Sequence, residues 1–278
     1  MQKRVMAIND ISCFGKCSLT VALPILSSAG LEACPVPTAL LSTHTGGFSD
    51  YTFKNLDDQI LPICEHWKKE GIAFDSIYSG YLGSYEQIEI VKKVIDDFSD
   101  SDVTVLVDPV MGDNGKLYAG FEEHFAEGMF ELCKKADIIV PNITEACYML
   151  NIKYKEEFSE DEIAEIARKF NEEGIKKAVI TGIRLSQDTV SCAICENGKC
   201  TFVKNDLIGG MYHGTGDVFA SALLSAILSG NSLDIATKIA VNFVRKCILL
   251  TKSRYGDSHY GVDFEDLLPD FIDEIKNK

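Results

Sequence analysis

In this chain of 278 residues, short apolar runs alternate with stretches of helix-like spacing. This alternation narrows the possible folds more than any other feature of the sequence. The runs are rich in β-branched residues, and helix-like apolar spacing follows most of them. The expected strands cover residues 5–8, 34–38, 77–79, 103–107, 138–140 and 178–180. The expected helices cover residues 18–29, 86–98, 159–171, 217–229, 233–250 and 264–275. A strand-then-helix order predicts an α/β fold with a mostly parallel central sheet and helices on both faces.

One segment departs from this alternation. Residues 191–195 and 201–204 are strand-like and are joined around Asn197-Gly198, a pair typical of tight hairpin turns. We therefore expect a small antiparallel hairpin beside the parallel strands. Because no repeat, low-complexity tract or linker interrupts the chain, we expect one domain over residues 1–278.

Composition narrows the choice of partners. The net charge is −15, which disfavours nucleic acid and anionic membranes as partners. No run approaches the about 20 apolar residues of a membrane helix, and no secretion signal is visible, so we expect a cytoplasmic protein. The ten cysteines are then expected to be reduced thiols. Cys192 and Cys195 lie on opposite faces of an expected strand, which disfavours a metal or redox role.

Polar side chains stand at the carboxyl ends of the expected strands or in the loops that follow. In open parallel sheets this edge is where ligands bind. The residues are Asp10, Tyr81, Asp108, Asp113, Asn142, Glu145 and Thr181. They predict a site assembled from segments spread over the whole chain.

Two pairs of these residues have competing interpretations. Asp108 and Asp113 offer the hard oxygen ligands that Mg²⁺ prefers beside substrate phosphates, or they form an ordinary turn. Asn142 and Glu145 have the spacing of a helix capping box, yet Glu145 would also face the strand-end site. His44, with Thr45 beside it, is a candidate for ligand binding or proton transfer, or a packed side chain.

The tetrapeptide Gly214-Thr215-Gly216-Asp217 precedes an apolar stretch over residues 218–228. Glycines at the start of a buried helix predict an anion site, because free N–H groups and the helix dipole meet there. An aspartate inside such a site suits a carboxylate that meets a hydroxyl group beside a phosphate. A plain helix-start turn is the alternative. A P-loop is excluded, since Gly214-Thr215 stands where Gly-Lys is required.

Together these motifs resemble the ribokinase superfamily, and within it the pyridoxal/pyridoxamine (vitamin B6) kinase branch. The matching segments are Gly80-Tyr81, residues 108–113 (Asp-Pro-Val-Met-Gly-Asp), Pro141-Asn142-x-x-Glu145, residues 214–217 and residues 36–45. The resemblance covers nearly the whole chain. It implies a ribokinase-like fold, transfer of the ATP γ-phosphate to the 5′-hydroxyl of a B6 vitamer, Mg²⁺ and a monovalent cation such as K⁺ as cofactors, and a homodimer.

The resemblance also implies roles for individual residues. Asp217 would be the catalytic base, with an anion hole formed by Gly214, Thr215 and Gly216. The vitamer would contact Asp10, His44, Thr45 and Tyr81. ATP would be held by Asp108, Asn142, Thr181, Gly214 and Gly216, with residues 114–118 as a nearby flap. Mg²⁺ would be bound by Asp113 and Glu145, and the monovalent cation by Asp108 and Thr181.

Two positions qualify the resemblance. Many pyridoxal kinases carry Ser where this chain has Asp10, so we expect a preference for pyridoxamine or pyridoxine over pyridoxal. Hydroxymethylpyrimidine kinases, and a related group of B6 kinases, usually carry Cys where this chain has Asp217, which disfavours the hydroxymethylpyrimidine activity but leaves it as an alternative. A non-catalytic vitamer- or nucleotide-binding protein is the other alternative. For Asp217 itself, we expect the helix dipole to favour the ionised form and to make it a weak base.

Overall fold

The structure is a computed structural model that describes residues 2–276. By its internal contacts the chain divides into two compact units, Met1–Gly83 with Ile208–Lys278, and Ser84–Leu207. Each unit is described by itself. The single-domain organisation expected from the sequence stays a prediction.

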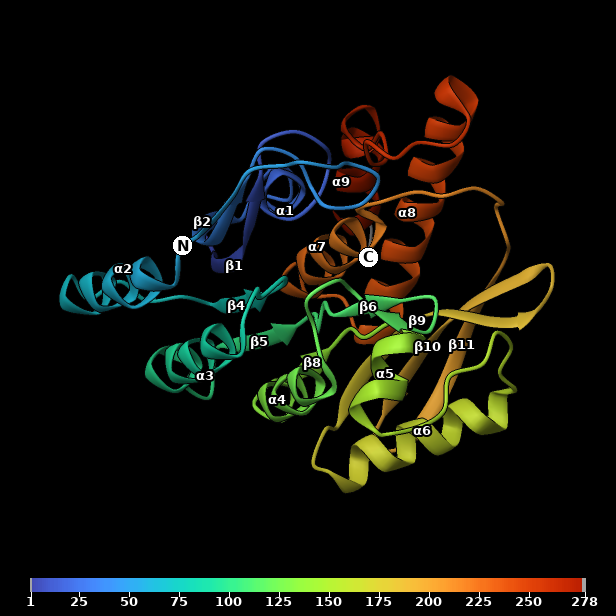
Figure 1. The fold of residues 1–278 in the computed structure, drawn as a ribbon, viewed down its shortest axis with the longest axis horizontal. Helices are drawn as coiled ribbons and strands as arrows, with labels where there is room; N and C mark the ends of the chain where they lie inside the picture. Colours follow the sequence, from blue (N-terminus) through green and yellow to red (C-terminus); the bar gives the residue numbers. More distant parts are fainter. Residues whose placement is uncertain (1, 277–278) are drawn as a thin grey trace. The chain divides into compact units, whose positions relative to one another are not determined.

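The first unit contains four strands in the order β4-β1-β2-β3. They are β1 (Arg4–Ser12), β2 (Glu32–Leu41), β3 (Phe53–Asn55) and β4 (Ser76–Ser79). Strand β1 pairs in parallel with β2 and β4, and β3 runs antiparallel to β2. Helices α1 (Leu19–Ser28) and α2 (Asp57–Lys69) pack against β2, as Figure 1 shows for α1 in blue. The apolar side chains of β1 from Val5 to Ile8 are fully buried and form the centre of this unit.

The C-terminal part of the first unit is helical. It comprises α7 (Thr215–Leu228), α8 (Leu233–Tyr255), the 3₁₀ turn η1 (Glu265–Leu267) and α9 (Leu268–Lys276). Helices α7 and α8 lie side by side (Figure 1). Most of α7 is buried, which explains why its sequence is apolar all round rather than amphipathic.

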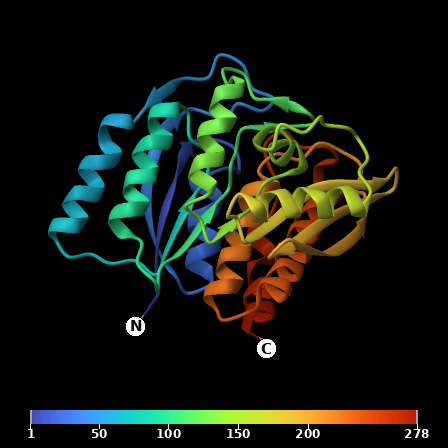
Figure 2. The same cartoon turned by 90° about the horizontal axis from the view of Figure 1, so that it is seen from below.

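The second unit has the strand order β11-β10-β9-β8-β5. Its strands are β5 (Thr104–Val107), β8 (Ile138–Ile139), β9 (Lys177–Ser186), β10 (Thr189–Glu196) and β11 (Lys199–Asp206), with a separate pair β6 (Gly112–Asp113) and β7 (Lys116–Leu117). Its helices are α3 (Tyr85–Phe98), α4 (Glu123–Cys133), α5 (Ile143–Met149) and α6 (Glu160–Glu172). Strands β5, β8 and β9 are parallel, whereas β10 and β11 are antiparallel. Figure 2 shows α6 lying across these last strands.

The expected α/β class and the hairpin are confirmed. Asn197 and Gly198 both have positive φ, 51° and 77°, as a tight hairpin turn requires. Strands β1 and β9 extend well beyond the expected ranges, which corrects the placement of two candidate residues. Asp10 lies inside β1 and Thr181 inside β9, not in the loops that follow. Helices α2 and α4 were not among the expected helices.

The cysteines differ from expectation in one pair. Cys195 and Cys200 are opposite each other on β10 and β11 and form a disulfide, so the expectation that every cysteine is a reduced thiol is wrong for these two. Cys192 is a free, buried thiol. Within residues 2–276, no helix has both the length and the apolar character needed to cross a membrane.

Candidate active site

The glycine loop forms the start of α7, as its sequence predicts. Gly214 is the residue before the helix and has a φ of 75°, a conformation that favours glycine. A side-chain carbon at Gly214 would lie 2.0 Å from the carbonyl oxygen of Lys16. The loop therefore needs glycine for its backbone conformation and for its close approach to the chain. Asp217 follows in the first helical turn, where backbone N–H groups are free of helical partners.

The Asp217 carboxylate is held from two directions. The backbone N–H of Ser18 donates to it, and Asn9 Nδ2 donates to its Oδ1 at 3.3 Å. Burial raises the pKa of Asp217 to about 6, and the nearby charge of Asp10 acts in the same direction. The expectation that the helix dipole makes this group a weak base is therefore wrong, because removal from water outweighs the stabilising contacts.

Asp10 lies at an irregularity in the pairing of β1 with β2. Such irregularities redirect side chains and are frequent beside active sites. Its carboxylate is buried, with 4% of the residue exposed, and it accepts hydrogen bonds from the hydroxyls of Ser18 and Ser12. Burial raises the pKa of Asp10, and the two serine hydroxyls oppose this rise.

Asn9 joins β1 to the loop after β4. Its Oδ1 accepts from the backbone N–H of Asp10 at 3.0 Å and of Tyr81 at 2.9 Å. A side-chain carbon at Gly80 would lie 2.3 Å from Asn9 Nδ2, so a larger residue there would displace the Asn9 side chain. Burial raises the pKa of the Tyr81 phenol to about 12, with Asp10 as a further cause. Tyr81 is therefore a neutral hydroxyl at pH 7.

His44 belongs to a cluster of aromatic rings. It is buried, and its ring centre lies 5.3 Å from that of His213 and 5.0 Å from that of Phe48. Burial lowers the pKa of His44, as does the proximity of His213, so His44 is neutral at pH 7. Thr45, the next residue, is exposed. The rest of the cluster is formed by Phe14, His259 and Tyr260.

In the second unit, Asp108 directly follows β5 and is buried, as is Glu145 in α5. Glu145 Oε1 accepts from the N–H of Met111 at 3.1 Å, and Oε2 accepts from the N–H of Asn142 at 2.8 Å. The Asn142 side chain accepts in return from the N–H of Glu145. The capping-box interpretation is thus confirmed. Burial and the charge of Asp108 hold the pKa of Glu145 well above its usual range.

Asn142 connects this cluster to two further segments. Its Nδ2 donates to the carbonyl of Gly112 at 2.8 Å, and its backbone forms a bridge with Thr181. Asp113 is exposed, and its carboxylate accepts from Asn114. The structure therefore gathers Asp108, its loop, Asn142, Glu145 and Thr181 in one unit. Residues 2–276 contain no group of three His, Cys, Asp or Glu poised to hold a metal, but Mg²⁺ in kinases needs only one or two carboxylates plus phosphates and water.

Sequence reasoning did not assign a role to Asn9 or Ser18. Both contact Asp217 in the structure. Their only sequence signals were the position of Asn9 beside Asp10 and that of Ser18 at the start of an expected helix. Neither signal reveals a contact with a residue some two hundred positions later.

Comparison with known proteins identifies the class to which this fold and site belong. Residues 23–263 match the model of the phosphomethylpyrimidine kinase family, and the chain belongs to that family. A crystal structure of a protein from Bacteroides thetaiotaomicron, provisionally named a phosphomethylpyrimidine kinase and crystallised with pyridoxal, is 36% identical with a TM-score of 0.92. The similarity covers 98% of this chain and 96% of that one.

The curated relatives include kinases named for two different kinds of substrate. The pyridoxine/pyridoxal/pyridoxamine kinase of Bordetella avium is 26% identical over 89% of this chain and 85% of that protein. The hydroxymethylpyrimidine/phosphomethylpyrimidine kinase of Bacillus subtilis is also 26% identical, over 79% of this chain and 78% of that protein. The identities are equal, so the sequence similarity alone does not choose between the two substrates.

Proposed function

We infer that this protein is an ATP-dependent kinase that phosphorylates the 5′-hydroxymethyl group of a vitamin B6 vitamer. The observation that carries the inference is Asp217, a half-buried carboxylate with a raised pKa behind a glycine loop at a helix N-terminus. The similarity over almost the whole chain to a protein crystallised with pyridoxal supports the B6 assignment.

The chemistry follows from this placement. Asp217 is mostly ionised at pH 7 because its pKa is about 6, and it is a stronger base than an exposed aspartate. It orients the vitamer hydroxyl and accepts its proton. The backbone N–H groups of Gly214, Thr215 and Gly216 stabilise charge on the γ-phosphoryl oxygens. We assign substrate contacts to Asp10, His44, Thr45 and Tyr81, and ATP contacts to Asp108, Asn142, Thr181, Gly214 and Gly216.

The second unit has donors suited to metal ions. Asp108 and Glu145 are buried, and the charge of Asp108 raises the pKa of Glu145, so a cation beside them would favour the ionised form of both carboxylates. We propose that Asp113 and Glu145 hold Mg²⁺ and that Asp108 and Thr181 hold a monovalent cation such as K⁺. When bound, Mg²⁺ neutralises phosphate charge. We also propose a homodimer in the cytoplasm.

Asp113→Asn is expected to raise the Mg²⁺ concentration for half-maximal activity roughly tenfold, because a metal-binding carboxylate is lost while the fold is kept. Activity is measured against Mg²⁺ at fixed ATP. The control is Asp161→Asn, an exposed aspartate in the first turn of α6, which should leave the curve unchanged. Identical curves for the wild type and Asp113→Asn would remove Asp113 from the metal site.

The vitamer preference follows from the charge of Asp10. A carboxylate at the substrate site favours an amine or a protonated ring, so kcat/KM is expected to be higher for pyridoxamine or pyridoxine than for pyridoxal. In Asp10→Asn the three values should move closer together. A clear preference of the wild type for pyridoxal would contradict this role of Asp10.

Hydroxymethylpyrimidine kinase is the second candidate. The family match and the Bacillus subtilis relative favour it, and both substrates contain a hydroxymethyl group on a heteroaromatic ring. The aspartate at position 217 disfavours this second activity, because those kinases, like a related group of B6 kinases, usually carry cysteine there. Assaying hydroxymethylpyrimidine beside the three vitamers separates the two activities.

A further inference from the structure

Ser18 begins helix α1 in an unusual conformation. Its φ is 58°, in the left-handed region that non-glycine residues seldom adopt. A serine before a helix normally caps it with its hydroxyl, but the Ser18 side chain makes no cap hydrogen bond. Strained residues of this kind persist where surrounding contacts impose them and often mark functional sites.

This conformation aims two donors of Ser18 at two carboxylates. Its hydroxyl donates to Asp10 Oδ1, and its backbone N–H donates to Asp217. Ser12 donates to the other oxygen of Asp10 at 3.0 Å, and Asn9 supplies the second hydrogen bond to Asp217. Ser18 thus donates a hydrogen bond to each of the two carboxylates.

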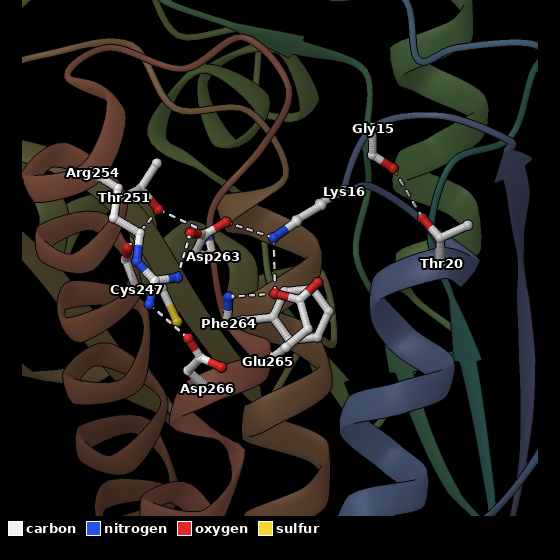
Figure 3. Close-up of polar contacts among 10 residues, drawn as sticks. All are labelled: Gly15, Lys16, Thr20, Cys247, Thr251, Arg254, Asp263, Phe264, Glu265 and Asp266. Atoms are coloured by element: carbon white, nitrogen blue, oxygen red, sulfur yellow. Dashed lines mark hydrogen bonds and ion pairs between the residues drawn. The ribbon is translucent and has the colours of Figure 1, made fainter.

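The loop before Ser18 is fixed from the opposite side. The backbone N–H of Lys16 donates to the carbonyl of Tyr260 at 2.8 Å. Lys16 Nζ contacts Asp263 at 2.6 Å and Glu265 at 2.8 Å, as Figure 3 shows. The same Asp263 is held by Arg254 on its other oxygen. The C-terminal segment therefore anchors the loop two residues before Ser18.

Two titratable groups face Asp217 among residues 2–276, namely Asp10 from β1 and Cys17 from the loop. Burial and the charges of the two carboxylates raise the pKa of the Cys17 thiol far above its usual range, so it stays neutral. Asp10 is therefore the source of negative charge beside Asp217. Such a charge makes a neighbouring carboxylate a better proton acceptor.

We propose that Ser18 is a positioning residue for phosphoryl transfer, which ties Asp217 to Asp10 and holds both in the arrangement that accepts the proton. This proposal rests on the function inferred above. In the step concerned, the vitamer oxygen bonds to the γ-phosphorus, and the bond from this phosphorus to the bridging oxygen breaks with its electron pair leaving on ADP. The proton of the vitamer hydroxyl passes to an Asp217 oxygen.

The test uses Ser18→Gly, Asp10→Asn and the double variant. Glycine retains the backbone N–H and tolerates a φ of 58°, so only the hydroxyl is lost. We expect a roughly tenfold lower kcat in Ser18→Gly with KM for ATP unchanged within twofold. We expect the kcat of the double variant to be close to that of Asp10→Asn, since both changes break the same hydrogen bond between Ser18 and Asp10. Ser232→Gly, at the start of α8 with an ordinary φ of −65°, is the matched control and should behave as wild type.

The pH dependence of kcat/KM provides a readout that a purely structural role would not move. Activity needs ionised Asp217 and falls as the pH drops through its pKa of about 6. Without the Asp10 charge this pKa falls, so the acid limb of Asp10→Asn should move to lower pH by about half a unit. Ser18→Gly should shift in the same direction, because Asp10 with one donor fewer is protonated more readily. The ionisation of the substrates is common to all variants.

The possible outcomes distinguish failure of the role of Ser18 from failure of the proposed kinase function. Near-normal turnover in Asp217→Asn would overturn the proposed base and with it the role of Ser18. The role of Ser18 alone would be overturned if Asp217→Asn is inactive while the losses of kcat in Ser18→Gly and Asp10→Asn are additive and the acid limbs of their pH profiles stay where they are in the wild type. Non-additive losses with shifted limbs are the expected result.

Discussion

Asp217→Asn is expected to lower kcat by about a thousandfold while ATP still binds. The amide retains the size of the side chain but cannot take up the proton of the vitamer hydroxyl. Asp217 is also the residue that Ser18 and Asn9 hold in place. The measurement is kcat from steady-state kinetics, together with the dissociation constant of ATP.

Asp234→Asn is the matched control. Asp234 also stands in the first turn of a helix, α8, where it pairs with Lys238 at 2.7 Å on the surface. Loss of such an exposed pair changes stability by less than about 1 kcal/mol and should leave kcat unchanged. Turnover of Asp217→Asn near that of this control would show that Asp217 is not the base.

Gly214→Ala is expected to abolish most activity and to lower the free energy of unfolding by about 3 kcal/mol, the sum of left-handed strain and overpacking. The added methyl group would lie 2.0 Å from the Lys16 carbonyl oxygen, so the glycine loop and the segment before Ser18 must move apart. This displacement would disturb the anion-binding N–H groups and the contacts of Asp217 together.

Gly30→Ala is the control that separates the cost of a left-handed backbone conformation from the cost of the steric clash with Lys16. Gly30 has a φ of 86°, and an added carbon there meets nothing within 4 Å. It should cost about 1 kcal/mol of stability and leave kcat unchanged. Urea unfolding and steady-state kinetics of both variants test the difference. Equal losses in the two would mean that the contact between Gly214 and Lys16 is unimportant.

Much of the fold was predictable because local patterns and tertiary structure agree. The capping residues Ser159 and Asn142 begin helices in the structure as their spacing predicts, and Asn197-Gly198 forms the hairpin turn. Helix α7 starts at the glycine loop. These features depend on contacts within a few residues, which the sequence displays directly.

The remaining features depend on contacts between distant segments. The raised pKa of Asp217 comes from burial and from Asp10, whereas the sequence shows only its place in a helical turn. The Cys195–Cys200 disulfide depends on the pairing of β10 with β11. The role of Ser18 depends on a φ of 58° that no local signal predicts.

The most direct test of the account is a coupled assay of ADP release by the purified protein with ATP, Mg²⁺ and, in turn, pyridoxal, pyridoxamine, pyridoxine and hydroxymethylpyrimidine. The account predicts vitamer-dependent ADP release with formation of the vitamer 5′-phosphate, at higher kcat/KM than with hydroxymethylpyrimidine. ADP release with hydroxymethylpyrimidine alone, or with none of the four compounds, would contradict it.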